Sequence, residues 1–107
     1  MIPSATTKQP SECTSLAEVR NEIDNIDKSI IDLLAQRFEY VKEVVKYKGN
    51  TPESIKADDR RLAVLNCRRQ WAHEAGLSPD VVEHIYDRLI AYFIDEEMKI
   101  KNEEATQ

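Results

Sequence analysis

The chain has 107 residues, of which 41% are hydrophobic and 33% are charged, and its formal net charge at pH 7 is −5. This length suits one domain with a single core, and the acidic balance argues against a nucleic-acid-binding protein, because phosphate contacts require a basic face. No apolar run approaches the roughly 18 residues that span a membrane, and the N-terminus has no hydrophobic segment of signal-peptide type. We therefore expect a cytoplasmic protein that binds neither nucleic acid nor membranes.

Neither the cysteines nor the histidines predict a cofactor site. Cys13 and Cys67 are too few and too far apart for a disulfide framework or a zinc site. His73 and His84 fall on different predicted helices, without acids or cysteines at ligand spacing. The sequence also contains no glycine-rich phosphate loop. We therefore expect no metal and no cofactor.

The first predicted element is a flexible N-terminal arm, because residues 1–14 are polar and include two prolines. Ser15 and Glu18 have the spacing of a capping box, which predicts that a long helix begins at Ser15. A Gly-Asn-Thr-Pro sequence should end this helix near Lys48.

This long helix carries two apolar seams with helical spacing. The first comprises Leu16, Val19, Ile23, Ile26, Ile30, Leu33, Tyr40, Val44 and Tyr47. The second comprises Ile31, Leu34, Phe38, Val41 and Val45. A helix this apolar needs more partners than a chain of this length supplies, so the pattern favours a homodimer.

Two further helices follow. One should begin between residues 56 and 59 and end at Gly76, a residue type favoured just after a helix. The other should begin at Ser78-Pro79, a capping hydroxyl followed by a first-turn proline, and run to about Asn102. The fold class is therefore all-α, a three-helix chain with one long N-terminal helix. Residues 15–102 form its single domain, and residues 103–107 form a frayed tail.

Arg37 interrupts the first seam where an apolar residue is expected. A charge on the buried face of a helix costs several kcal/mol unless an anion meets it. Lys48 lies on the same face, about 16 Å further along a straight helix, so both side chains could converge on one compact dianion. A structural carboxylate that pairs with Arg37 explains this feature equally well.

Arg20 is a third candidate cation. It lies about 25 Å from Arg37 along a straight helix and on a different face, so one small molecule cannot contact both in one chain. If both bind the same ligand, Arg20 must come from a second, antiparallel copy. The alternative is a surface ion pair between Arg20 and Asp24.

Glu97 interrupts the apolar stripe of the third helix, which otherwise comprises Tyr86, Ile90, Phe93 and Ile100. Desolvation there favours the neutral acid, which can donate a hydrogen bond. The alternative is an ionised Glu97 that neutralises Arg37 or Arg60. Arg60 begins the second helix, just after the loop, and could turn inward.

Several segments in or just before the predicted first helix match the sequence pattern of a known protein family. They are Cys13-Thr14-Ser15-Leu16-Ala17-Glu18-Val19-Arg20, Ile23-Asp24-x-Ile26-Asp27, Arg37, Tyr40-Val41-Lys42 and Lys48. This pattern resembles the all-helical chorismate mutase family. The segment Arg69-x-Trp71-Ala72-x-Glu74-x-Gly76-Leu77 is more similar to its isochorismate-pyruvate lyase branch, which forms salicylate. The similarity covers residues from about Ser11 to Lys101.

The resemblance implies an intertwined homodimer of the chorismate mutase type II fold with two shared active sites. Arg37, Lys48 and Arg60 would come from one subunit and Arg20 from the other. Arg20 and Arg37 would hold the carboxylates of a dicarboxylate substrate, chorismate or isochorismate. Lys48 would face the ether oxygen of the enolpyruvyl group.

Two positions depart from the family pattern. Where the mutase branch usually has an acidic residue after the second helix's arginine, this chain has Arg61, which favours the lyase reading. Where both branches commonly have glutamine, this chain has Glu97, which replaces the amide donor only when protonated.

We therefore predict an isochorismate-pyruvate lyase with chorismate mutase activity from the same site. Lys48, Arg37 and Glu97 are the predicted catalytic residues, and Arg20 and Arg60 complete the substrate-binding set. A dedicated chorismate mutase that makes prephenate is the first alternative. A catalytically silent helical dimer, in which Arg37 and Glu97 form a buried structural pair, is the second.

Overall fold

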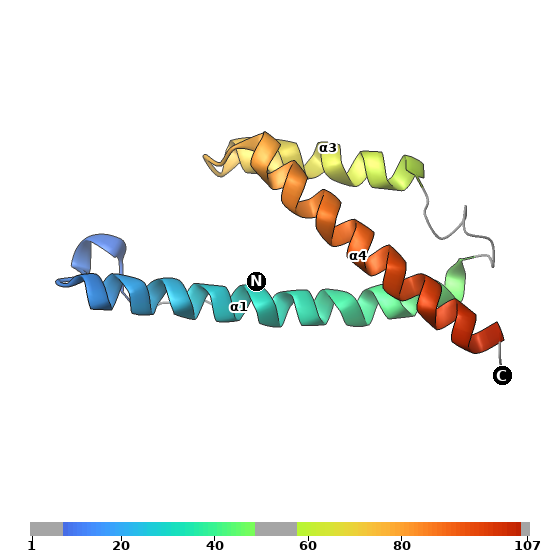
Figure 1. The fold of residues 1–107 in the computed structure, drawn as a ribbon. Coiled ribbons are helices and arrows are strands. Elements are labelled where there is room, and N and C mark those ends of the chain that lie inside the picture. Colours follow the sequence, from blue (N-terminus) through green and yellow to red (C-terminus); the bar gives the residue numbers. More distant parts are fainter. Residues whose placement is uncertain (1–7, 49–57, 106–107) are drawn as a thin grey trace. The chain divides into compact units, whose positions relative to one another are not determined.

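The structure is a computed structural model that describes residues 8–48 and 58–105. Every regular element in these ranges is helical (Figure 1), which confirms the predicted all-α fold. In chain order the elements are the 3-10 helix η1 (Pro10–Glu12), α1 (Leu16–Val44), the 3-10 helix η2 (Val45–Tyr47), α3 (Asp58–Glu74) and α4 (Pro79–Ala105). None of these helices is long and apolar enough to cross a membrane.

The chain forms two compact units, Met1–Glu39 and Tyr40–Gln107, which we describe separately. The boundary falls within α1, so the first unit holds most of this helix and the second holds its last residues together with η2, α3 and α4. Three predicted features lie partly or wholly outside the described residues. They are residues 1–7 of the arm, the break at residues 49–52, and a start of the second helix at residue 56 or 57.

The start of α1 keeps half of the expected capping box. The Glu18 amide donates to Ser15 Oγ at 3.1 Å, as the sequence predicts. The Glu18 carboxylate does not return to the Ser15 amide; it accepts from the Thr14 amide at 2.6 Å instead. Residues 8–14 of the predicted arm include η1 and contact the first turn of α1.

The end of α1 differs from the prediction in its last turn. The α-helix ends at Val44, and η2 continues the chain in the tighter 3-10 form. Lys48 then has extended backbone angles, φ −97° and ψ 153°, and its amide donates to the Val45 carbonyl at 3.3 Å. The regular α-helical rise and rotation therefore do not extend to Lys48.

A Schellman motif ends α3 at the predicted glycine. The Leu77 amide donates to the Ala72 carbonyl at 2.8 Å, and the Gly76 amide donates to the His73 carbonyl at 3.1 Å. Gly76 has φ 79°, a left-handed conformation that disfavours residues with a Cβ. Ser78 then caps α4 through a 3.3 Å bond from the Val81 amide. These local signals confirm the predicted turn, and α4 continues to Ala105, beyond its expected end at Asn102.

The second unit contains every buried hydrophobic side chain among the described residues. They are Val45 of η2, Val64 and Ala72 of α3, and Phe93 and Ile94 of α4. Trp71 is not part of this core: it is 54% exposed, and the Arg68 guanidinium lies 4.4 Å from its ring centroid.

The first unit has the opposite character, because α1 contains no buried residue within the chain. Leu16, Val19, Ile23, Ile26 and Ile30 of the first seam are between 39% and 63% exposed. The predicted seam is therefore present as a stripe of uncovered apolar side chains.

Candidate active site

The second unit brings two of the predicted site residues together. Lys48 Nζ lies 2.9 Å from Glu97 Oε1, which joins the end of η2 to α4. The Glu97 side chain is 4% exposed and the Lys48 side chain 22%. Burial of an isolated carboxylate costs several kcal/mol, so the ammonium and its hydrogen bond offset a large part of that penalty.

The surroundings of this pair are apolar on the side of the core. Val45, on the turn that precedes Lys48, is 1% exposed, and Phe93, one helical turn before Glu97, is 5% exposed. Electrostatic interactions are stronger where water is excluded. A donor at Lys48 Nζ can therefore stabilise negative charge more effectively here than on an open surface.

The pairing differs from the one expected for Glu97. The sequence pointed to Arg37 or Arg60 as the cation that would neutralise it, whereas the structure joins it to Lys48. Both members of the pair were among the predicted site residues, but their contact depends on how η2 packs against α4. Sequence spacing within one helix contains no information about that packing.

The other three predicted cations lie elsewhere on the described helices. Arg20 and Arg37 belong to the first unit; Arg20 is exposed, near the start of α1, and Arg37 is half-buried. Within residues 8–48 Arg20 forms no ion pair with Asp24, so the structural alternative for Arg20 gains no support. Arg60 is exposed in the first turn of α3.

Arg61 has a role that the sequence did not reveal. Its Nε and Nη2 donate to Asp87 Oδ1 at 3.1 Å and 2.8 Å, and Nη2 also approaches the Asp87 carbonyl at 3.4 Å. This side chain therefore connects α3 to α4. No local spacing signals such a contact, because it depends on the register between two helices.

A second arginine connects the same helices near their turn. Arg69 Nη1 lies 2.8 Å from Asp80 Oδ1 and 3.2 Å from Glu83 Oε1. The hydrogen bond to Asp80 is the main cause of the raised pKa of the Arg69 guanidinium. Arg61 and Arg69 thus connect α3, which carries Arg60, to α4, which carries Glu97.

The described residues contain no group of three or more histidine, cysteine or acidic side chains that could hold a metal ion. Cys13 and Cys67 are free thiols. Lys48 and Glu97 are the polar side chains that the structure brings together at the candidate site.

Comparison with known proteins decides the family. Residues 19–98 match the family described as chorismate mutase type II. The chain belongs to this family. The match spans most of α1, all of η2 and α3, and most of α4, so every predicted site residue lies within it.

Individual relatives of this chorismate mutase family member carry different names. The chain is 38% identical to the isochorismate pyruvate lyase of Pseudomonas aeruginosa over 92 residues, which cover 86% of this chain and 90% of that protein. It is 38% identical to the T-protein of Haemophilus influenzae over 71% of this chain, and 33% identical to the bifunctional chorismate mutase/prephenate dehydratase of Aquifex aeolicus over 80%. The matched regions make up only 20% and 25% of those two proteins.

Proposed function

We propose that this chorismate mutase family member is an isochorismate-pyruvate lyase that converts isochorismate to salicylate and pyruvate. We further propose that the same site has chorismate mutase activity. The observation that carries the proposal is the partly buried Lys48–Glu97 pair, which lies within the family match. The similarity to a lyase along nearly the whole length of both proteins favours the lyase over a dedicated mutase.

The proposed reaction suits these residues. In the lyase reaction the enolpyruvyl C–O bond breaks while a ring hydrogen moves to the enolpyruvyl methylene carbon, so no nucleophile is required. Such a concerted step depends on a held conformer and on stabilised charge at the departing oxygen. In this proposal Lys48 Nζ donates to that oxygen, Arg37 and Arg20 hold the carboxylates, and Arg60 completes the pocket.

The proposal includes a homodimer in which each site takes Arg20 from the partner subunit. The uncovered seam from Leu16 to Ile30 supports this arrangement, because half-exposed isoleucines at helical spacing are typical of a helix that packs on another helix. The family resemblance supplies the antiparallel pairing. A cytoplasmic location, expected from the composition, stays a prediction.

Two roles for Glu97 within this site lead to different expectations. As a neutral acid it would donate a hydrogen bond to the substrate, as the glutamine of related proteins would. As a carboxylate it would hold Lys48 Nζ in place, and the 2.9 Å contact supports this second role. Glu97→Gln separates the two. Retained turnover would favour the donor role, and a large loss of kcat would favour the anchoring role.

Two separate incubations test the function. Purified protein is given chorismate or isochorismate, and prephenate, salicylate and pyruvate are measured. We expect equal amounts of salicylate and pyruvate from isochorismate, and slower prephenate formation from chorismate. Prephenate alone would identify a dedicated mutase. No product from either substrate would indicate the silent helical dimer and overturn the proposal.

Mixed dimers test whether Arg20 crosses between subunits. Arg20→Ala and Arg37→Ala homodimers should each be nearly inactive. After subunit exchange, a mixed dimer should contain one site with both lesions and one intact site, and should therefore recover about half of the wild-type activity. No recovery after verified exchange would place both arginines in the same subunit's site.

A further inference from the structure

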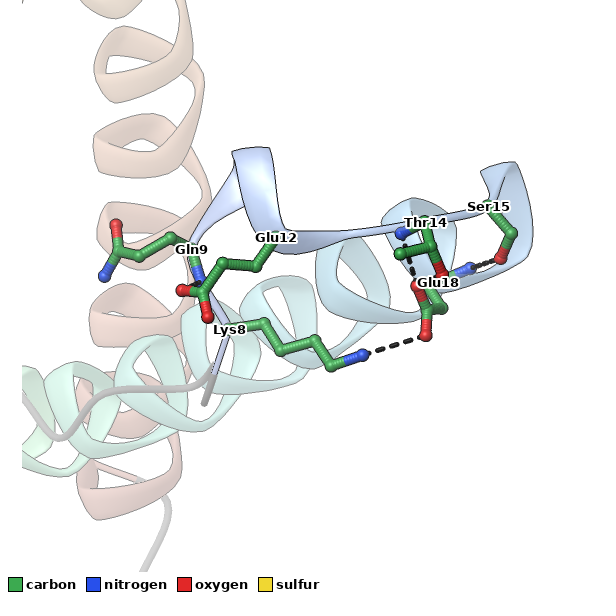
Figure 2. A network of polar contacts seen from close by, with 6 residues as sticks. All are labelled: Lys8, Gln9, Glu12, Thr14, Ser15 and Glu18. Carbon is green, nitrogen blue, oxygen red and sulfur yellow. Dashed lines mark hydrogen bonds and ion pairs between the residues drawn. The ribbon is translucent and has the colours of Figure 1, made fainter.

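The short segment before α1 is held against the first turn of that helix by one carboxylate (Figure 2). Glu18 accepts three hydrogen bonds: from the Thr14 amide at 2.6 Å, from Thr14 Oγ1 at 2.8 Å and from Lys8 Nζ at 2.8 Å. The Glu18 amide in turn donates to Ser15 Oγ at 3.1 Å. The Glu18 carboxylate therefore binds both ends of the segment, Lys8 and Thr14, to the first turn of α1.

The linked segment has internal structure of its own. The Glu12 amide donates to the Gln9 carbonyl at 2.9 Å, and the Gln9 amide donates to Glu12 Oε1 at 2.9 Å (Figure 2). These reciprocal bonds close the turn of η1 between the two attachment points. We call residues 8–15 with Glu18 the N-terminal latch.

The charges of the latch reinforce its hydrogen bonds. The bond from Lys8 is the main cause that lowers the pKa of Glu18 to about 2, and the two bonds from Thr14 add to it. Glu18 and Glu22, one turn apart on the helix, both raise the pKa of Lys8. A carboxylate in the first turn also interacts favourably with the positive end of the helix.

The Glu18 side chain projects to the side of α1 away from Arg20. At about 100° per residue, Glu18 and Arg20 project about 200° apart, and Arg20 is exposed. Arg20 is nevertheless only one turn from the start of α1, in the part of a helix that frays when its amides lack partners. An anchored first turn fixes the backbone that carries Arg20 without covering its side chain.

We propose that Glu18 is a positioning residue: by anchoring residues 8–14 to the first turn of α1, it fixes the backbone from which Arg20 reaches the substrate in the partner subunit. This inference rests on the proposed function and on the shared site. Because Arg20 is proposed to hold a substrate carboxylate, loss of the latch should weaken substrate binding more than turnover.

The first test separates the latch from the active site. Glu18→Gln should speed hydrogen exchange of the Thr14 and Glu18 amides and raise KM roughly three- to tenfold, with kcat within about twofold of wild type. The matched control is Lys28→Met, which removes an exposed pair with Asp32 on the same helix and should leave both KM and those amides unchanged. Unchanged KM in Glu18→Gln with faster exchange would overturn the positioning role.

Mixed dimers give the sharper test. When a Glu18→Gln chain is paired with an Arg37→Ala chain, both lesions should fall on one site. The other site should then work with wild-type KM, at about half of the wild-type kcat per dimer. A KM that stays at the Glu18→Gln value would mean that Glu18 acts within its own subunit, which overturns the proposal.

A failed proposal can be distinguished from a failed function. Inactivity of the wild-type protein on both substrates would overturn the function, and the positioning role with it. If Arg20→Ala and Arg37→Ala complement each other while the Glu18→Gln result is negative, the shared site stands and only the role of Glu18 is rejected.

Discussion

The two units of this chain use their apolar side chains in opposite ways. In the second unit, η2, α3 and α4 share a core that contains Val45, Val64, Ala72, Phe93 and Ile94. Arg61 and Arg69 of α3 also form ion pairs with acidic residues of α4. In the first unit, no residue of α1 is fully buried, and side-chain ion pairs join Lys8 to Glu18 and Lys28 to Asp32.

This contrast indicates where each unit obtains its stability. Burial of a Val, Leu or Ile side chain contributes about 1.5–3 kcal/mol. Completing the burial of five half-exposed side chains on α1 would therefore stabilise a complex by on the order of 5 kcal/mol per chain. The α3–α4 hairpin packs within one chain, whereas the proposed dimer would cover the apolar stripe of α1 with a second chain.

The largest expected effect comes from breaking the seam of α1. Ile26→Asp places a charge among apolar side chains that the proposed dimer would bury, so it should dissociate the dimer and abolish activity. Sedimentation at micromolar concentration should change from about twice the 12.4 kDa chain mass to the mass of one chain. Asn25→Asp, on the polar face beside it, makes the same charge change and should leave mass and activity as in wild type. A folded wild-type monomer, or a dimeric Ile26→Asp, would contradict the pairing.

The next effect concerns the polar pair in the second unit. Lys48→Ala removes the donor proposed for the departing oxygen and should lower kcat about 10²- to 10³-fold, with a smaller change in KM. Lys46→Ala is the control, because Lys46 is exposed two residues earlier and pairs with Glu43. Near wild-type turnover in Lys48→Ala would leave Lys48 as a purely structural partner of Glu97.

A smaller effect is expected from the contact between α3 and α4. Because the Arg61 and Asp87 side chains are 29% and 49% exposed, Arg61→Ala should lower the free energy of unfolding by only about 0.5–1 kcal/mol. The exchanged pair Arg61→Asp with Asp87→Arg should recover part of this loss in denaturant titrations. Arg88→Ala, at an exposed position next to Asp87, serves as the control. No recovery in the exchanged pair would mean that Arg61 contributes by packing alone.

The smallest effect is the pH dependence of the latch. Glu18 has an ordinary pKa of 4.5 in the unfolded chain and about 2 in the folded chain. Its contribution to stability is therefore present above about pH 4.5 and is lost as the pH falls through 2. The raised pKa of Lys8 gives a contribution that is present below its ordinary value of 10.5 and lost as the pH rises through the folded value. Unfolding free energies of wild type and Glu18→Gln should converge between pH 5 and pH 2; parallel curves would contradict this assignment.

Local chemistry explains which parts of the fold were predictable. The Ser15 cap, the Gly76 stop and the Ser78 cap depend on neighbours in sequence, and all three have their expected hydrogen bonds. Apolar spacing also identified Phe93 and Glu97 as members of a buried stripe.

Neither sequence neighbours nor apolar spacing predicts which side chains of different elements contact one another. Three ion pairs depend on how separate segments pack together. They are Lys8 with Glu18 in the N-terminal latch, Arg61 with Asp87, and Lys48 with Glu97.

The turn at Gly76 is a site where the chain can be substituted or labelled. A Cβ at this position would meet nothing within 4 Å, so only the left-handed backbone restricts the choice of residue. Asparagine tolerates that conformation better than alanine does. The same open space makes the turn a suitable attachment point for a spectroscopic label or an inserted peptide. Such a probe would report on the hairpin while the ion pairs on either side of it continue to hold α3 against α4.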